Sequence, residues 1–370
     1  MKFSCEKALL QEAISIASRA VTTRSTIALL EGLRITADKT LTLAGYDLSM
    51  GIKTSIEADI VEPGEVVLSA KLLGDIVRKL PNDTIWIEVD NHFVTTIKCG
   101  RAVFTLVAQS SENYPALPEV NSAHEMRLPE KTLKNLINKT VFAVSDNMAK
   151  PIHTGCLFET AGDRLTVVGV DGFRLAIRRE TLPEQPAEDF RFVVGGTALR
   201  EIERILGEGI EENAWIYPDE NHILFRIGDT ELIARLISGD FLNYNAAIPA
   251  DLPFTVSVDI QQMTQTLERV SLLVSEKLKN PVRIRFDGDM MKMSCVTQIG
   301  KSYDECPIGG IINDLEIGFN SRYLLDALRA TAEDVACLSV KSALSPLVIT
   351  PVKGDAFTYL VLPVRLKADA

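Results

Sequence analysis

The segment Phe3-Ser-Cys-Glu-Lys-Ala-Leu-Leu-Gln-Glu-Ala-Ile14 reads as a short strand, a polar break and an amphipathic helix, and this pattern occurs three times. The second copy is Met126-Arg-Leu-Pro-Glu-Lys-Thr-Leu-Lys-Asn-Leu-Ile137, and the third is Val256-Ser-Val-Asp-Ile-Gln-Gln-Met-Thr-Gln-Thr-Leu267. Apolar residues at spacings of three and four lie on one face of each helix. They are Leu10, Ala13, Ile14 and Ala17; Leu133, Leu136, Ile137 and Thr140; and Met263, Thr266, Leu267 and Val270.

A second strand–break–helix pattern follows each of these copies. It begins at Val66, at Phe192 and at Ile317. Alternating runs lie between the two helices of each unit, and they are joined by short polar turns that are typical of hairpins. The runs are Leu33–Thr36 with Leu41–Leu43, Leu157–Thr160 with Leu165–Val168, and Arg283–Phe286 with Met291–Ser294 around Asp287-Gly-Asp. The repeat predicts an α+β fold of three tandem domains, 1–122, 123–250 and 251–370, each made of two strand–helix–strands halves.

Composition limits the class of protein. The 370 residues are 46% hydrophobic and 24% charged, which is typical of a globular protein, and the formal net charge is −11. As a bulk property, this acidity argues against a simple nucleic-acid binder and against an anionic membrane surface. We expect no signal peptide behind Met1-Lys-Phe-Ser-Cys-Glu-Lys and no membrane span. Six scattered cysteines suit a reducing cytosol, so a cytoplasmic protein is expected.

The charge is unevenly distributed. The predicted helix windows 6–20, 70–80, 130–140, 196–206, 259–279 and 320–330 together carry +5, which leaves −16 elsewhere. Mixed charge on separate exposed helices would explain this excess equally well. If all six helices lie on one side of a curved sheet, they form a weakly positive surface that attracts phosphates without reading sequence.

Catalytic motifs are not found in the sequence. Gly300-Lys301-Ser302 resembles the end of a phosphate-binding loop, but Cys295 stands where the first glycine is required. Gly207-Glu-Gly209 lacks the third glycine of a dinucleotide fingerprint, and the four histidines have no neighbours at metal-ligand spacing. We therefore expect no catalytic residue, no metal and no cofactor.

The motif Asp171-Gly-Phe-Arg174 could be imagined as an acid–base loop. Its counterpart in the first unit is Asp47-Leu-Ser-Met50, where the aspartate recurs without the arginine. An aspartate that recurs after a strand is more often a turn former than a general base. The motif is therefore interpreted as a structural turn.

The residues also resemble a known family, the bacterial DNA polymerase III beta subunit or sliding clamp, over nearly the whole chain. The resemblance lies in Met1-Lys-Phe-Ser, the ten residues from Arg24, Lys150–Thr160, Thr166–Ala176, Leu272–Lys277, Glu316–Asp326 and the terminal Leu360-Val-Leu-Pro-Val-Arg-Leu366. It implies a head-to-tail homodimeric ring with sheets outside and helices lining the hole. Such a ring encircles double-stranded DNA and tethers the replicative polymerase without catalysing a reaction. Twelve helices about 10 Å apart would enclose a circle roughly 38 Å across, whereas six would give roughly 19 Å, too narrow for a duplex.

The resemblance further implies three sets of site residues. A groove between the second and third domains would bind short linear motifs of the polymerase, the clamp loader and repair proteins. Its residues are Val170, Gly172, Phe173, Arg174, Leu175, Leu242, Ala247, Pro346, Val361, Leu362, Pro363, Val364, Arg365 and Leu366. DNA would be faced by Arg24, Lys71, Arg78, Asn147, Lys150 and Arg204, and the ring joint would contain Leu272 and Leu273. At the rim, Phe173, Leu242, Asn245 and Ala246 depart from the residues usual in the family, so the motif preference is open.

Each of these sets has a plain alternative. The basic residues could be ordinary solvated charges, Leu272 and Leu273 could belong to the core of the third domain, and Val361–Leu366 could be a terminal edge strand. For the whole protein, two other classes stay open: an adaptor that binds peptides but not DNA, and an enzyme whose constellation is not recognisable from the sequence.

Overall fold

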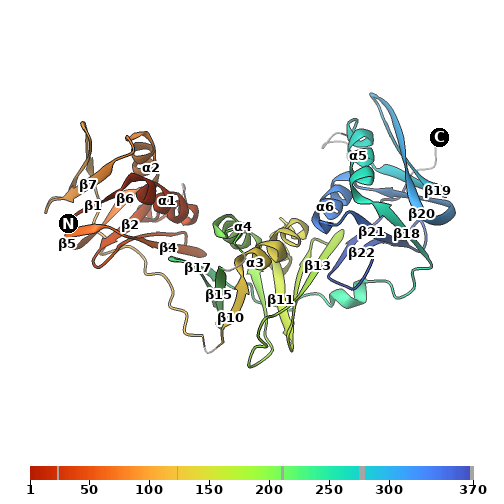
Figure 1. Ribbon diagram of the computed structural model, residues 1–370, viewed down its shortest axis with the longest axis horizontal. Helices are drawn as coiled ribbons and strands as arrows, with labels where there is room; N and C mark the ends of the chain where they lie inside the picture. The colour runs from red at the N-terminus through yellow and green to blue at the C-terminus, as the bar shows by residue number, and fades with distance from the viewer. Residues whose placement is uncertain (23–24, 123, 210–211, 275–279, 367–370) are drawn as a thin grey trace. The chain divides into compact units, whose positions relative to one another are not determined.

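The computed structural model describes residues 1–370 apart from 23–24, 123, 210–211, 275–279 and 367–370. The chain divides into two compact units. Unit 1 contains Met1–Lys134 and Thr197–Leu236, and unit 2 contains Asn135–Gly196 and Ile237–Ala370. The middle third of the sequence therefore contributes to both units. Each unit is described by itself below (Figure 1).

Unit 1 has two antiparallel sheets. The strands are β1 (Lys2–Glu6), β2 (Gly32–Ala37), β3 (Leu41–Tyr46), β4 (Met50–Ile56), β5 (Asp59–Glu62), β6 (Gly64–Ser69), β7 (Thr84–Val89), β8 (Val94–Cys99), β9 (Ala102–Val107), β10 (Met126–Pro129), β15 (Asn213–Pro218), β16 (His222–Ile227) and β17 (Thr230–Arg235). One sheet has the order β5-β1-β7-β8-β9, and the other has the order β10-β15-β16-β17-β4-β3-β2-β6. The second sheet is continuous from the first domain into the second because β17 pairs with β4, with Ala234 opposite Met50.

Unit 2 has one ten-stranded sheet. Its strands are β11 (Gly155–Ala161), β12 (Arg164–Val170), β13 (Arg174–Thr181), β14 (Arg191–Gly195), β18 (Phe254–Asp259), β19 (Val282–Thr297), β20 (Gly300–Phe319), β21 (Val335–Val340), β22 (Leu347–Pro351) and β23 (Phe357–Val361). The order is β14-β11-β12-β13-β23-β22-β21-β18-β20-β19. Here β13 pairs with β23, with Arg174 opposite Val361, so this sheet also crosses a domain boundary.

Six α-helices occur in the described residues. They are α1 (Lys7–Ala17), α2 (Ala70–Lys79), α3 (Glu130–Asn138), α4 (Gly196–Ile205), α5 (Ile260–Ser271) and α6 (Ser321–Thr331). Short 3-10 turns cover Ser18–Ala20, Ala28–Glu31, Val141–Ala143, Pro151–Thr154 and Tyr244–Ala247. The polar breaks serve as N-caps in three cases: the side chains of Ser69, Asp259 and Asn320 accept bonds from backbone N–H groups of α2, α5 and α6.

The periodic apolar residues lie where the sequence predicts. All four are buried in each copy. Two glycines recur beneath the ends of the first helices. A Cβ on Gly45 would lie 2.2 Å from the Ala17 carbonyl oxygen, and one on Gly169 would lie 2.4 Å from that of Thr140. Helix and sheet backbones therefore approach each other closely at equivalent points of two domains.

Three predictions from the sequence need correction. The fifth helix ends at Ser271, well before the end of the predicted window 259–279, of which 275–279 lie outside the described residues. The runs Arg283–Phe286 and Met291–Ser294 belong to one strand element, β19, and the predicted turn is a shift in its register with β20 around Gly288. As observed, the six helices hold 11 basic and 7 acidic residues. Their net charge is thus +4, against −15 elsewhere.

The edge-strand interpretation of Val361–Leu366 is also wrong. Strand β23 lies inside the sheet, between β13 and β22, and ends at Val361. The chain beyond it leaves the sheet, and Val364 makes an isolated bridge with Gly318.

Candidate protein-binding groove and subunit-joint surfaces

The loop Asp171–Arg174, called the groove loop below, begins with the aspartate that recurs in the first domain. One carboxylate oxygen of Asp171 accepts hydrogen bonds from the backbone N–H groups of Phe173 (2.9 Å) and Arg174 (3.0 Å). Asp47 makes the same bonds to Ser49 (2.8 Å) and Met50 (2.7 Å). Both aspartates therefore build the same turn, as the repeat predicts.

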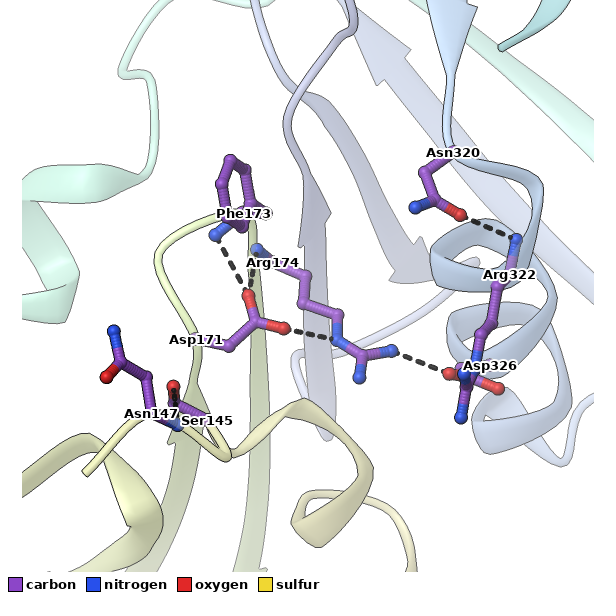
Figure 2. A network of polar contacts seen from close by, with 8 residues as sticks. All are labelled: Ser145, Asn147, Asp171, Phe173, Arg174, Asn320, Arg322 and Asp326. Atoms are coloured by element: carbon purple, nitrogen blue, oxygen red, sulfur yellow. Dashed lines mark hydrogen bonds and ion pairs between the residues drawn. The ribbon is translucent and has the colours of Figure 1, made fainter. Parts of the chain in front are cut away.

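Arg174 connects this loop to α6. Figure 2 shows its guanidinium between two carboxylates, with Nε 2.9 Å from Oδ2 of Asp171 and Nη1 2.6 Å from Oδ2 of Asp326. The guanidinium carbon also lies 4.5 Å from the ring centre of Tyr323 and 5.5 Å from that of Phe142. With its side chain 11% exposed, Arg174 is held on several sides by charge and by aromatic faces.

The C-terminal segment runs beside the groove loop. The N–H of Leu362 donates to the carbonyl oxygen of Phe173 (2.8 Å), and the N–H of Val364 donates to that of Gly318 (2.8 Å). The phenyl ring of Phe173 is 61% exposed and stacks on Tyr323, with ring centres 6.3 Å apart. The predicted groove residues on these two segments are therefore neighbours.

Exposure divides the predicted groove residues into two layers. Val170, Leu175 and Val361 are buried and belong to the cores beneath the sheet. The exposed members are Gly172, Phe173, Leu242, Ala247, Leu362, Val364 and Arg365, while Arg174, Pro346, Pro363 and Leu366 are half-buried. All of these residues lie within unit 2.

Sequence reasoning missed Tyr323 and Asp326. Both lie on α6 and contact the groove loop through Phe173 and Arg174. Their segment, Glu316–Asp326, carries a family resemblance and no motif that points to a binding site. Nothing in its pattern signals that the sixth helix reaches a loop about 150 residues earlier in the chain.

Two polar side chains near the groove, the buried Tyr244 and the half-buried His153, have shifted pKa values. Burial and a hydrogen bond to Glu159 raise the pKa of Tyr244 to about 12, so this phenol stays neutral. His153 packs edge-on against Phe241, and burial together with the charge of Lys150 lowers its pKa. Tyr244 and Phe241 flank the exposed Leu242 in the chain, so the segment that carries Leu242 is anchored on both sides.

A second candidate surface surrounds the end of α5. Leu272 is 81% exposed, so the alternative that it belongs to the core is wrong, whereas Leu273 is half-buried. Ile299, in the turn before β20, and Tyr303 on β20 are exposed, and a Cβ on Gly300 between them would lie 3.6 Å from Leu273. In unit 1, exposed apolar residues occur on α2 and β9 at Leu72, Val103, Phe104 and Val107.

The predicted DNA-facing residues occur on helices and one loop. Lys71 is exposed on α2, where Arg78 pairs with Asp75, and Arg204 of α4 pairs with Glu201 at 2.5 Å. Asn147 and Lys150 lie in the exposed loop that precedes Pro151–Thr154. Arg24 lies outside the described residues.

Among the residues that the structure describes, no group of three or more His, Cys, Asp or Glu side chains is arranged to hold a metal ion. No described helix is long and apolar enough to cross a membrane.

Comparisons with known proteins agree with the threefold division. Family models of the DNA polymerase III beta subunit match residues 1–118 (N-terminal domain), 127–243 (central domain) and 245–365 (C-terminal domain). The beta sliding clamp of Halalkalibacterium halodurans is 33% identical over 99% of this chain and 100% of its own length. Crystal structures of the DNA polymerase sliding clamp from Bacillus subtilis (31% identity, TM-score 0.95) and of a putative beta subunit from Eubacterium rectale (33%, TM-score 0.94) each cover 99% of this chain and 100% of their own.

These matches decide between the classes that the sequence left open. The enzyme and the adaptor that ignores DNA are both set aside, because the family is a non-catalytic processivity factor that acts with DNA and the polymerase. The chain belongs to the DNA polymerase III beta subunit family and is a bacterial sliding clamp that confers processivity on the replicative polymerase.

Proposed function

We propose that two copies of this chain join head to tail into a ring of six domains, with domain boundaries near residues 122 and 250. Sheets form the outside and helices line the hole. The observation that carries this proposal is that both domain boundaries within the chain are closed in the same way, by the last strand of one domain pairing with a strand of the preceding domain. A third boundary of the same kind would need strands from two copies.

The repeat supplies the strands for that third joint. Strand β9 is equivalent to β17 and β23, and within the described residues its ladder runs to β8 only. The first part of β20, from Gly300 to Pro307, is equivalent to β4 and β13, and among the residues that the structure describes it is paired with β19 only. Each strand thus has a free edge, and free edges are ready to pair with another chain.

The register of the joint follows from the two closed boundaries. The Arg235 N–H donates to the Ser49 carbonyl (2.9 Å), as Leu362 does to Phe173. By the repeat, Val107 is equivalent to Arg235 and Leu362, and Ile299 is equivalent to Ser49 and Phe173. We therefore expect Val107 to donate to Ile299 of the second copy, and Leu106 to lie opposite Gly300.

The apolar side chains near the joint support the same arrangement. Leu272 is equivalent in the repeat to Arg19 and Phe142, and both of these contact the following domain. Arg19 pairs with Glu201 at 3.1 Å, and Phe142 packs edge-on against Tyr359. An exposed leucine at this position suits a partner's apolar surface, which Leu72 and Phe104 would supply.

The hole would hold duplex DNA without reading its sequence. The helices are net positive while the remainder of the chain is strongly acidic, which favours DNA inside the ring and disfavours it outside. Contacts are proposed for Lys71, Arg78, Asn147, Lys150, Arg204 and the undescribed Arg24. Weak contacts of this kind permit sliding, and the closed ring makes rebinding of a tethered polymerase effectively intramolecular.

The groove would dock short linear motifs of the polymerase, the clamp loader and repair proteins in the cytoplasm. Exposed Phe173, Leu242, Leu362 and Val364 offer apolar contacts, and the buried Val170, Leu175 and Val361 form the floor. A short peptide would bury these side chains against the terminal segment.

Disulfide cross-linking tests the proposed joint. The variant Val103→Cys/Tyr303→Cys places cysteines directly opposite each other in the expected register, and mild oxidation should give covalent dimers. The matched variant Val103→Cys/Lys301→Cys is out of register by two residues and should cross-link poorly. Equal cross-linking of both variants, or a protein that stays monomeric at micromolar concentration, would overturn the proposed joint.

A further inference from the structure

We propose that Asp326 is a positioning residue for the peptide groove, acting through Arg174 without touching the peptide itself. The inference rests on the proposed function of the groove and adds a residue from the sixth helix to it. Asp326 lies on α6, whereas the groove loop lies between β12 and β13.

The contact is direct and partly shielded. Nη1 of Arg174 lies 2.6 Å from Oδ2 of Asp326, with side-chain exposures of 11% and 25%. In Figure 2 the guanidinium extends from the loop toward α6, and it is the only drawn group with bonds to both the loop and α6. A charged hydrogen bond of this geometry fixes the orientation of the planar guanidinium.

Arg174 also orders the exposed rim of the groove, which is formed by Phe173 and Tyr323. Its guanidinium lies against the Tyr323 ring, and Phe173 stacks on that ring as well. The carbonyl of Phe173 in turn accepts the Leu362 N–H, so the two segments that border the groove are linked through one residue. Loss of the Asp326 carboxylate frees one end of Arg174 and loosens this stack.

At the first domain boundary, the acid at the helical position equivalent to Asp326 contacts no groove loop in the described part of the chain. Glu201 of α4 is the repeat equivalent of Asp326, and it is also bound by an arginine, Arg19, at 3.1 Å. Arg19 lies in the 3-10 turn Ser18–Ala20 that follows α1, whereas the loop equivalent to Asp171–Arg174 has Met50 in the place of Arg174. At the second boundary, the arginine that pairs with the helical acid Asp326 is Arg174 of the groove loop, so this acid is coupled to the groove.

This difference provides a matched pair of variants. Asp326→Asn and Glu201→Gln each remove one carboxylate charge from an equivalent helix position beside an arginine. If Asp326 acts through Arg174, only the first should weaken peptide binding, because an unordered rim must be ordered when the peptide binds. We expect about a tenfold loss of affinity, the size usual for a charged hydrogen bond that is partly exposed.

The test uses the full-length dimer and a fluorescein-labelled peptide containing Gln, Leu and Phe, titrated by fluorescence anisotropy. Asp326→Asn should weaken binding about tenfold, Asp326→Glu should recover part of the loss, and Glu201→Gln should stay within about twofold of wild type. In an Arg174→Ala background, Asp326→Asn should cost nothing further. An equal loss in Glu201→Gln, no loss in Asp326→Asn, or an additive loss in the double variant would overturn the proposal.

A second readout does not need a peptide. Amide hydrogen exchange of Phe173 and Arg174 in the unliganded dimer should speed up about tenfold in Asp326→Asn and stay unchanged in Glu201→Gln. If wild type bound no peptide but this exchange rose as expected, the groove function would fail while the positioning role of Asp326 would stand. Unchanged exchange in Asp326→Asn would refute the positioning role regardless of peptide binding.

Discussion

The exposed Leu272 provides the sharpest test of the subunit joint. Replacing Leu272 with Ala removes most of a side chain that is 81% exposed in the single chain and that the ring would bury. Full burial of a leucine side chain contributes about 1.5–3 kcal/mol, so the truncation should cost about 2 kcal/mol at each joint. A ring has two joints, and the total of about 4 kcal/mol corresponds to a rise of about a thousandfold in the dimer dissociation constant.

Analytical ultracentrifugation of the wild type and of Leu272→Ala over a range of concentrations measures this constant. Leu344→Ala is the matched control, because Leu344 belongs to the same domain and is 72% exposed but lies in the loop between β21 and β22, outside the proposed joint. Its dissociation constant should equal that of the wild type. A change below about threefold in Leu272→Ala, or an equal effect of Leu344→Ala, would refute the placement of Leu272 in the joint.

Three further outcomes are expected. Because burial lowers the pKa of His153 below its usual 6.5, the unfolded chain protonates first. The contribution of neutral His153 to stability is therefore complete above pH 6.5 and is lost as the pH falls below 6.5. In urea melts, His153→Leu should gain stability relative to wild type as the pH is lowered from 7.5 to 5. A difference that stays constant with pH would contradict this. Gly169→Ala should lose about 3 kcal/mol in the same melts because its Cβ meets the Thr140 carbonyl, whereas Gly74→Ala within α2, whose Cβ would meet the Ile14 side chain at 3.4 Å, should be neutral or slightly stabilising. Lys71→Gln should reduce the slope of log affinity for duplex DNA against log salt by about one per contacting copy, while Lys98→Gln on β8 should leave it unchanged.

Local features of the fold follow from the sequence because they depend on neighbouring residues. The buried faces of the helices are read from spacings such as that of Leu10, Ala13 and Ile14, and the Asp47 and Asp171 turns follow from one short motif. The end of α5 was missed because the apolar pattern continues into Leu272 and Leu273 after the helix stops. Periodicity shows which residues could face a core, and it does not show where the backbone leaves the helix.

Long-range pairing could not be read in this way. Strand β23 has the composition of any buried strand, and nothing local indicates that it pairs with β13, about 180 residues earlier. The bond between Arg174 and Asp326 depends on that pairing, so the contact between α6 and the groove loop cannot be read from the sequence. The residues of the groove came instead from family resemblance, and the structure adds how they are held.

Release from DNA of defined topology tests the encircling ring most directly. The protein is loaded by a clamp loader onto nicked circular DNA, isolated with it, and the DNA is then cut once with a restriction enzyme. A ring that holds DNA only by enclosing it should remain on the uncut circles and slide off the ends of the cut DNA. Equal retention on circular and linear DNA would contradict the account.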